Sequence, residues 1–239
     1  MNKLTIAWMY PDILNLHGER GSVQALIRTA ENLGLEPELL RVEDFDDPIP
    51  FEKIDLMLFL PGELKTLGVI REALRPQEER LRSYVEQGGT LVAIGTSGLI
   101  FGKRITRLDG SALEGFGLLD LNAAERKYVW GDDLHLCIRQ SKQELIGCQI
   151  MMADVEAAQP FGRTLYGRGN NGSGAEGAQY QNLIYTNCLG PLFVKNPWFA
   201  EDLIRKICLR RIGLAPKRSN DLALASFDTT LNFLQRKQK

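Results

Sequence analysis

The sequence predicts an α/β fold, a three-layer sandwich in which helices cover both faces of a mostly parallel sheet. Short apolar segments alternate with segments of helical spacing through the N-terminal half of the 239 residues. Most of these apolar segments are continuous, which is typical of strands buried on both faces. Glycine and proline separate the segments, as they do between compact elements. Strands and helices that alternate in this way form parallel sheets with right-handed crossovers.

The individual elements follow from these patterns. The predicted strands are, in order, residues 4–9, 36–42, 55–60, 90–94 and 182–186. The predicted helices are residues 22–33, 76–87 and 197–212. Ser22 is the expected N-cap of the first helix, and Gly34 and Gly213 lie where helices of this kind end. Proline at the first position of the other two helices favours a helix start.

The pattern changes after Gly102. Residues 134–138 and 145–150 are expected to be short hairpin or edge strands, and the Gly- and Asn-rich residues 167–177 a loop. Residues 214–239 carry apolar side chains at helical spacing within a polar stretch. This C-terminal segment is expected to be either a docked helix or a partly ordered tail.

Composition excludes several classes of function. The formal net charge of −1 offers no electrostatic surface for nucleic acid. The longest apolar run, residues 54–60, is too short to cross a membrane, and the N-terminus leads directly into a strand without a signal-peptide pattern. The four cysteines are scattered, so we expect free thiols in the cytoplasm and no zinc site or disulfide framework. No cofactor motif is evident.

A candidate site follows the strand at residues 90–94. That strand runs into Gly95, Thr96, Ser97 and Gly98, a shape typical of a nucleophile elbow. In an open parallel sheet, sites form beyond the carboxyl ends of the strands. A helix that starts there would direct N–H groups at an oxyanion.

Three motifs, in order, support a resemblance. Residues 10–21 read Y-P-D-I-L-N-L-H-G-E-R-G, residues 114–120 read E-G-F-G-L-L-D, and the closing motif spans residues 169–197. They resemble the cobyric-acid-synthase-type branch of class I glutamine amidotransferases, and within it the glutaminase subunits of lipid II isoglutaminyl synthases. The resemblance implies a flavodoxin-like sandwich over residues 1–213. It also implies a Mur-ligase-like partner that uses ammonia from glutamine to amidate a peptidoglycan precursor.

The chain departs from this family at the positions that carry the chemistry. The family's nucleophilic Cys aligns with Gly95 and its catalytic His with Leu189, so we expect no catalytic residue at either position. The glutamine-contacting Gln aligns with Leu99. The oxyanion loop carries Pro61, which has no N–H to donate. The family's glutamine-binding Arg falls near Tyr128, with Arg126 and Lys127 beside it. The expected pocket residues are Gly62, Gly95, Thr96, Ser97, Leu99, Tyr128, Cys188 and Leu189.

Three functions are consistent with this pattern. The first is a catalytically degenerate subunit that supports a Mur-ligase-like or other synthetase partner. The second is a small-ligand sensor that uses the former glutamine pocket, which Leu99 and Leu189 would make more apolar. The third is an active amidotransferase with remodelled chemistry at Thr96, Ser97 or Cys188, although such a hydroxyl or thiol still needs a base.

Overall fold

A computed structural model describes residues 3–217 and 221–237, and confirms the predicted α/β architecture. The N-terminal Met1 and Asn2, on which the signal-peptide interpretation partly depends, lie outside the described residues. The main sheet has six strands in the order β11-β12-β4-β3-β1-β2. All are parallel except β11, which pairs antiparallel with β12. The strands are β1 (Lys3–Met9), β2 (Glu36–Val42), β3 (Leu56–Phe59), β4 (Thr90–Ile94), β11 (Ala178–Tyr180) and β12 (Leu183–Thr186).

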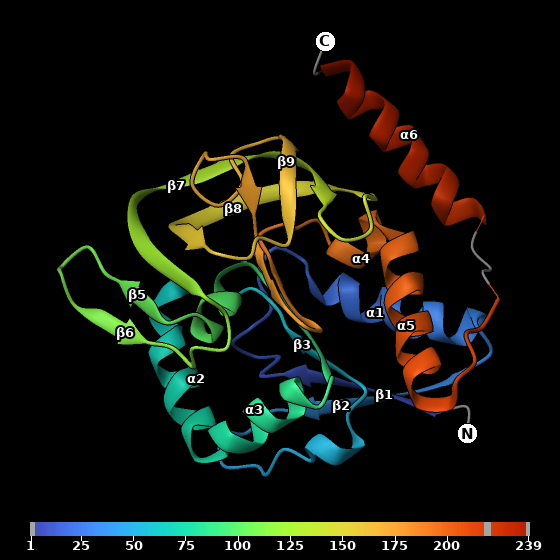
Figure 1. The fold of residues 1–239 in the computed structure, drawn as a ribbon, viewed down its shortest axis with the longest axis horizontal. Coiled ribbons are helices and arrows are strands. Elements are labelled where there is room, and N and C mark those ends of the chain that lie inside the picture. The colour runs from blue at the N-terminus through green and yellow to red at the C-terminus, as the bar shows by residue number, and fades with distance from the viewer. Residues whose placement is uncertain (1–2, 218–220, 238–239) are drawn as a thin grey trace.

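Helices cover both faces of this sheet (Figure 1). The α-helices are α1 (Arg20–Asn32), α2 (Leu67–Leu74), α3 (Glu78–Glu86), α4 (Leu192–Lys195), α5 (Pro197–Ile212) and α6 (Asp221–Lys237), and the first five cover the sheet. The chain leaves β1 toward β2 in one direction along the sheet and leaves β3 toward β4 in the other. Because crossovers are right-handed, α1 lies on one face and α2 with α3 on the opposite face. Helix α5 packs beside α1, and α6 projects from the body at the C-terminal end.

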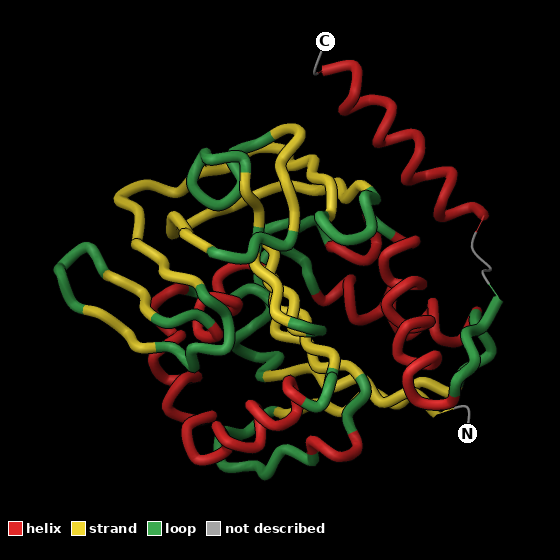
Figure 2. Tube along the Cα trace, in the orientation of Figure 1, coloured by secondary structure: helices red, strands yellow, loops and turns green. Residues whose placement is uncertain are grey.

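A second sheet lies beside the main sheet. In Figure 2 most of its strands lie above the main sheet, and the hairpin of its first two strands projects to the left. Its order is β10-β9-β7-β5-β6, and β8 pairs with β7. The strands are β5 (Arg104–Thr106), β6 (Ala112–Glu114), β7 (Leu121–Ile138), β8 (Glu144–Ala157), β9 (Gly162–Tyr166) and β10 (Ala175–Glu176). The expected short strands at 134–138 and 145–150 are thus parts of longer ones. The middle of β7 is exposed, so its residues carry no apolar alternation that would predict a strand.

The first helix begins earlier than its sequence suggests. Glu19 occupies the N-cap position of α1, and Ser22 lies inside the helix. The Ser22 hydroxyl donates to the Glu19 carboxylate over 2.7 Å instead of accepting a backbone N–H. The expected N-cap role of Ser22 is therefore wrong, because a buried acid three residues earlier takes the cap position.

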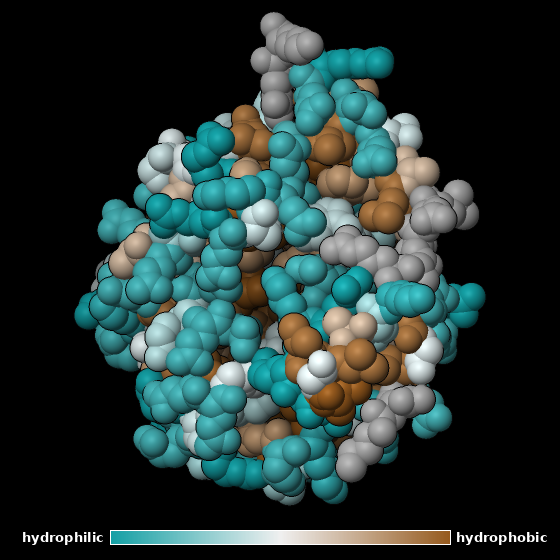
Figure 3. Space-filling view, turned by 45° about the vertical axis from the view of Figure 1, so that its right-hand side comes forward, coloured by the Kyte–Doolittle hydropathy of each residue, from teal (hydrophilic) through white to brown (hydrophobic). Residues whose placement is uncertain are grey.

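Apolar side chains fill the space between the layers, and the face in Figure 3 is mostly hydrophilic, with its hydrophobic residues gathered in separate patches. Strands β3 and β4 are buried along their whole length. Within the part of the chain that the structure describes, no helix combines the length and apolarity needed to span a membrane.

Candidate functional site

The turn after β4 has the backbone of a nucleophile elbow but lacks a side chain. Gly95 has a φ of +66°, in the left-handed region that favours glycine, and begins a 3₁₀ helix, Gly95–Phe101. A Cβ built on Gly95 would lie 3.2 Å from Pro61 Cβ and 3.5 Å from Leu189 Cδ2. Positions 95 and 189 therefore face each other, with neither a nucleophile nor a base between them.

A cavity of about 300 Å³ opens at this point. Its lining residues are Leu16, His17, Pro61, Gly62, Glu63, Leu64, Gly95, Thr96, Val129, Ile150, Met152 and Leu189. Most of this surface is apolar, and a glutamine in such a pocket would lose hydrogen bonds to water without replacing them. The cavity therefore favours an apolar occupant over the amino acid that the family hydrolyses.

The hydroxyls near the elbow are engaged in structural hydrogen bonds. Thr96 Oγ1 accepts from Gly62 N at 3.2 Å and donates to the Gly62 carbonyl. Ser97 is fully buried, and its Oγ lies 3.1 Å from the carbonyl oxygens of both Phe59 and Ile94. These contacts fasten the elbow to the strands beside it and leave neither hydroxyl directed at a substrate.

The thiol of Cys188 is a poor candidate nucleophile. It is completely buried, and burial raises its pKa well above the ordinary value. Since the thiolate is the reactive form, this environment suppresses reactivity. Cys188 does not line the cavity, although it precedes Leu189, which does.

The two histidines occupy different environments. His17 lines the cavity with a φ of 59°, and burial lowers its pKa, which favours the neutral ring. His135 is buried on β7, where its Nε2 lies 2.8 Å from Glu144 Oε2, and it is not part of the cavity lining. Only His17 therefore shares the cavity with Thr96, whose hydroxyl is already bound to Gly62.

The structure brings together half of the expected pocket residues. Gly62, Gly95, Thr96 and Leu189 line the cavity, whereas Ser97, Leu99 and Cys188 are buried beside it and Tyr128 points outward, 71% exposed. Arg126, the alternative to Tyr128 as a glutamine-binding position, is held at 2.7 Å by both oxygens of Asp154. Its guanidinium is therefore engaged elsewhere.

Three residues of the cavity wall were not predicted from the sequence, because they come from β7 and β8, far from the elbow in the chain. Val129 from β7 and Ile150 and Met152 from β8 form one wall. Pairing between these strands shifts register between Glu125 and Trp130, where β7 carries extra residues opposite β8. Such a bulge re-aims side chains next to a site. The sequence feature that could have indicated this wall is the run from Tyr128 to Trp130, three large apolar residues in a polar stretch.

Buried Glu19 holds the segment that carries Leu189. Its Oε1 accepts from Gly190 N at 2.7 Å, and its Oε2 accepts from Leu192 N at 3.1 Å and from the Ser22 hydroxyl. Burial raises the pKa of Glu19, and the hydrogen bonds oppose this effect. The motif at residues 10–21 therefore holds the backbone of the motif at residues 169–197 through Glu19.

A second buried carboxylate holds the same segment from the other side. Glu176 Oε1 accepts from Asn187 N at 2.7 Å, and Oε2 accepts from the Thr186 hydroxyl at 3.0 Å. Burial raises the pKa of Glu176 to about 7, although its two hydrogen bonds oppose this effect. Leu189 thus lies between two anchored stretches of backbone.

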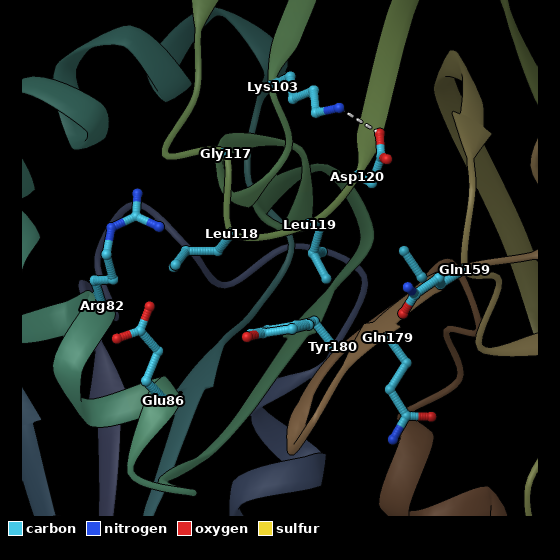
Figure 4. Close-up of a pocket in the computed structure, with 11 residues that line it drawn as sticks. Arg82, Glu86, Lys103, Gly117, Leu118, Leu119, Asp120, Gln159, Gln179 and Tyr180 are labelled. Atoms are coloured by element: carbon cyan, nitrogen blue, oxygen red, sulfur yellow. Dashed lines mark hydrogen bonds and ion pairs between the residues drawn. The ribbon is translucent and has the colours of Figure 1, made fainter.

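The loop at residues 114–120 is hydrogen-bonded to the 3₁₀ helix that follows the elbow. Phe116 N donates to Ile100 O at 2.7 Å, and Leu119 N donates to Phe101 O at 2.8 Å, at the end of the 3₁₀ helix. Beyond this loop, a separate cavity of about 280 Å³ lies between α3 and β11, where Lys103 pairs with Asp120 at 2.6 Å (Figure 4). The motif therefore has a structural role here.

The sheet order, the flanking helices and the glycine turn after β4 define the fold of a class I glutamine amidotransferase. A crystal structure of a glutamine amidotransferase matches with a TM-score of 0.51 and 13% identity, covering 82% of this chain and 97% of that one. PurLQS from Thermotoga maritima matches with a TM-score of 0.55 and 14% identity, covering 97% of this chain and 100% of that one.

In sequence, the chain is similar to GatD, a subunit of lipid II isoglutaminyl synthase (glutamine-hydrolyzing). GatD of Streptococcus pneumoniae (strain ATCC BAA-255 / R6) is 23% identical over 242 residues, covering 96% of this chain and 88% of the relative. GatD of Staphylococcus aureus (strain N315) is 25% identical over 231 residues, covering 93% and 92%. No family model matches the chain. These relatives confirm the resemblance to this glutaminase subunit.

Among residues 3–217 and 221–237, no group of three or more His, Cys, Asp or Glu side chains is arranged to hold a metal ion.

Proposed function

We propose that this chain is a catalytically degenerate, cytoplasmic amidotransferase-like subunit that supports a Mur-ligase-like or other synthetase partner in cell-wall precursor amidation. The observation that carries the proposal is the pair Gly95 and Leu189, which face each other across the retained elbow without nucleophile or base. Loss of such residues typically lowers the rate of a triad enzyme by about 10⁴- to 10⁶-fold.

The surface beside the cavity supports a binding role. Tyr128 and Val129 are 71% and 56% exposed, and Trp130 is 38% exposed. Val129 also lines the cavity, so the exposed run continues into it. Arg168 stacks over the Trp130 ring, 5.6 Å from its centroid. Tyrosine, tryptophan and arginine are enriched at the energetic centres of protein interfaces.

The test is reconstitution with the synthetase-type partner, using glutamine or ammonium chloride as the nitrogen source. We expect amidation with ammonium chloride that depends on this chain, and none above background with glutamine. Glutamine-dependent amidation would overturn the proposal. So would a partner whose ammonia-dependent activity and stability do not change when this chain is left out.

A small-ligand sensor is the second candidate, because the cavity is apolar and about 300 Å³ in volume. It predicts that an uncharged apolar compound stabilises the chain in a thermal-shift screen, and that Leu189→Asp abolishes the shift. The remodelled-enzyme alternative has less support, since Thr96 and Ser97 are hydrogen-bonded to backbone carbonyls and Cys188 is buried.

A further inference from the structure

A groove along α5 forms a second site at the opposite end of β4 from the elbow. Thr90 is the first residue of β4 and lines the groove, whereas Gly95 follows the last. The groove encloses about 180 Å³ between α5, the turn after β7 and the start of β12. It shares no lining residue with the apolar cavity.

The wall of the groove formed by α5 is aromatic at one end and positively charged at the other. Trp198, Asp202, Lys206 and Arg210 all line it and lie four residues apart, so they form one row on α5. At about 1.5 Å per residue, this row is roughly 18 Å long. Its beginning is aromatic and its end is cationic.

The aromatic end of the groove is lined by three buried rings. Phe161 and Phe199 lie there with ring centroids 6.1 Å apart, and Trp198 and Phe199 are 5.5 Å apart. All three side chains are buried and line the groove. These buried rings make this end of the groove apolar, and an apolar group that entered it would contact the ring edges that line the groove.

The cationic end carries one net positive charge. The charged lining residues are Asp202, Lys206 and Arg210, and Asp202 pairs with Lys206 at 3.0 Å. Arg210 donates to the Thr90 hydroxyl through two contacts of 3.3 Å and, among the described residues, forms no ion pair. Asp55, whose charge acts on the same region, is already bound to Arg211 at 2.7 Å. The guanidinium therefore remains available to an anion.

We infer that this groove binds a small amphipathic monoanion. Its apolar or aromatic body lies at the end lined by Phe161, Trp198 and Phe199, and its anionic group lies at Lys206, whose ammonium reaches back to Asp202, one turn from Trp198. Arg210 adds positive charge at the far end of the row. One net positive charge matches one negative charge. The amides of Gln140 and Asn182 and the Ser141 hydroxyl line the same groove and supply further polar groups. The volume is below the roughly 300–1,000 Å³ of drug-sized sites, so the ligand has few heavy atoms.

The test compares three probes of one shape: indole-3-acetate, its neutral amide and the cation tryptamine. Each is titrated into the full chain and followed by backbone amide NMR shifts. We expect indole-3-acetate to shift the amides lining the α5 groove, and to bind at least tenfold more tightly than the other two. Methyl phenyl phosphate, a phosphodiester that carries one negative charge, is run in parallel and distinguishes a phosphate from a carboxylate head group.

Two variants locate the site. Lys206→Gln with Arg210→Gln should weaken indole-3-acetate about tenfold, and Ser141→Trp should close the mouth and abolish binding. Arg205→Gln, on the same helix but outside the lining, is the matched control and should bind like the wild type. Failure of every anionic probe to shift the lining amides, or equal binding of the amide and the acetate, would overturn the inference.

Discussion

The side chains at the elbow and the backbone around the cavity differ: the side chains offer no catalytic group, whereas the backbone is held by an extensive set of buried hydrogen bonds. Pro61, Gly95 and Leu189, at three neighbouring strand ends, carry no group that could attack or activate a substrate. The backbone that carries Leu189 is nevertheless held by two buried carboxylates, Glu19 and Glu176. Under the proposed function, this buried hydrogen-bond network serves the shape of the region and not catalysis. The difference indicates that the shape of this region still matters, and four variants test that conclusion.

The largest expected effect is that of Glu19→Ala. This change leaves Gly190 N and Leu192 N without their acceptor in a buried environment. Each unsatisfied buried group costs about 1–3 kcal/mol, so we expect a loss of about 3–5 kcal/mol in the free energy of unfolding. Denaturant titration measures it, with exposed Glu31→Ala as the control. A loss below about 1 kcal/mol would show that these hydrogen bonds are dispensable.

Glu176 predicts how stability depends on pH. Its folded-state pKa of about 7 lies above the ordinary value of 4.5, so the folded chain holds a proton that the unfolded chain releases. The stabilisation is complete below pH 4.5 and is lost as the pH rises to 7. The difference of about 2.5 between these two pKa values corresponds to a loss on the order of 3 kcal/mol, and Glu176→Gln should flatten the profile. Unfolding free energies at several pH values measure this. Glu156→Gln, an exposed change on β8, is the control, and an unchanged slope in Glu176→Gln would contradict the prediction.

Gly95→Ala tests the elbow itself. A methyl group there meets Pro61 at 3.2 Å, on a backbone of φ +66°. We expect a loss of about 1–2 kcal/mol in unfolding free energy, because an L-residue is strained in this region. Gly68→Ala is the matched control. A Cβ on Gly68 meets no atom within 4 Å and the residue lies in α2, so that change should stabilise by about 0.5–1 kcal/mol. Equal effects of the two changes would show that the elbow is unstrained.

The sequence predicts five of the six strands of the main sheet, because most of them are short, largely apolar runs, but it does not predict β11. Residues 4–9 and 90–94 correspond closely to β1 and β4. The middle of β7 could not be predicted in this way, since its exposed residues follow neither helical nor strand periodicity. The position of the elbow follows from the small residues after β4. The apolar wall of the cavity does not, because it depends on how two strands distant in sequence pair around a bulge.

Tyr128→Ala should have the smallest effect on stability and a selective effect on binding. The side chain is 71% exposed, so its removal should change the free energy of unfolding by less than about 0.5 kcal/mol. Because it lies beside Val129 at the cavity rim, the same change should weaken association with the synthetase partner at least tenfold, as at an interface hot spot. Tyr180→Ala, a second exposed tyrosine, on β11, is the control for both measurements. Titration calorimetry of the reconstituted pair measures the affinity. If both tyrosine variants bound the partner like the wild type, the retained shape would have to serve something other than a docking surface at the rim of the cavity.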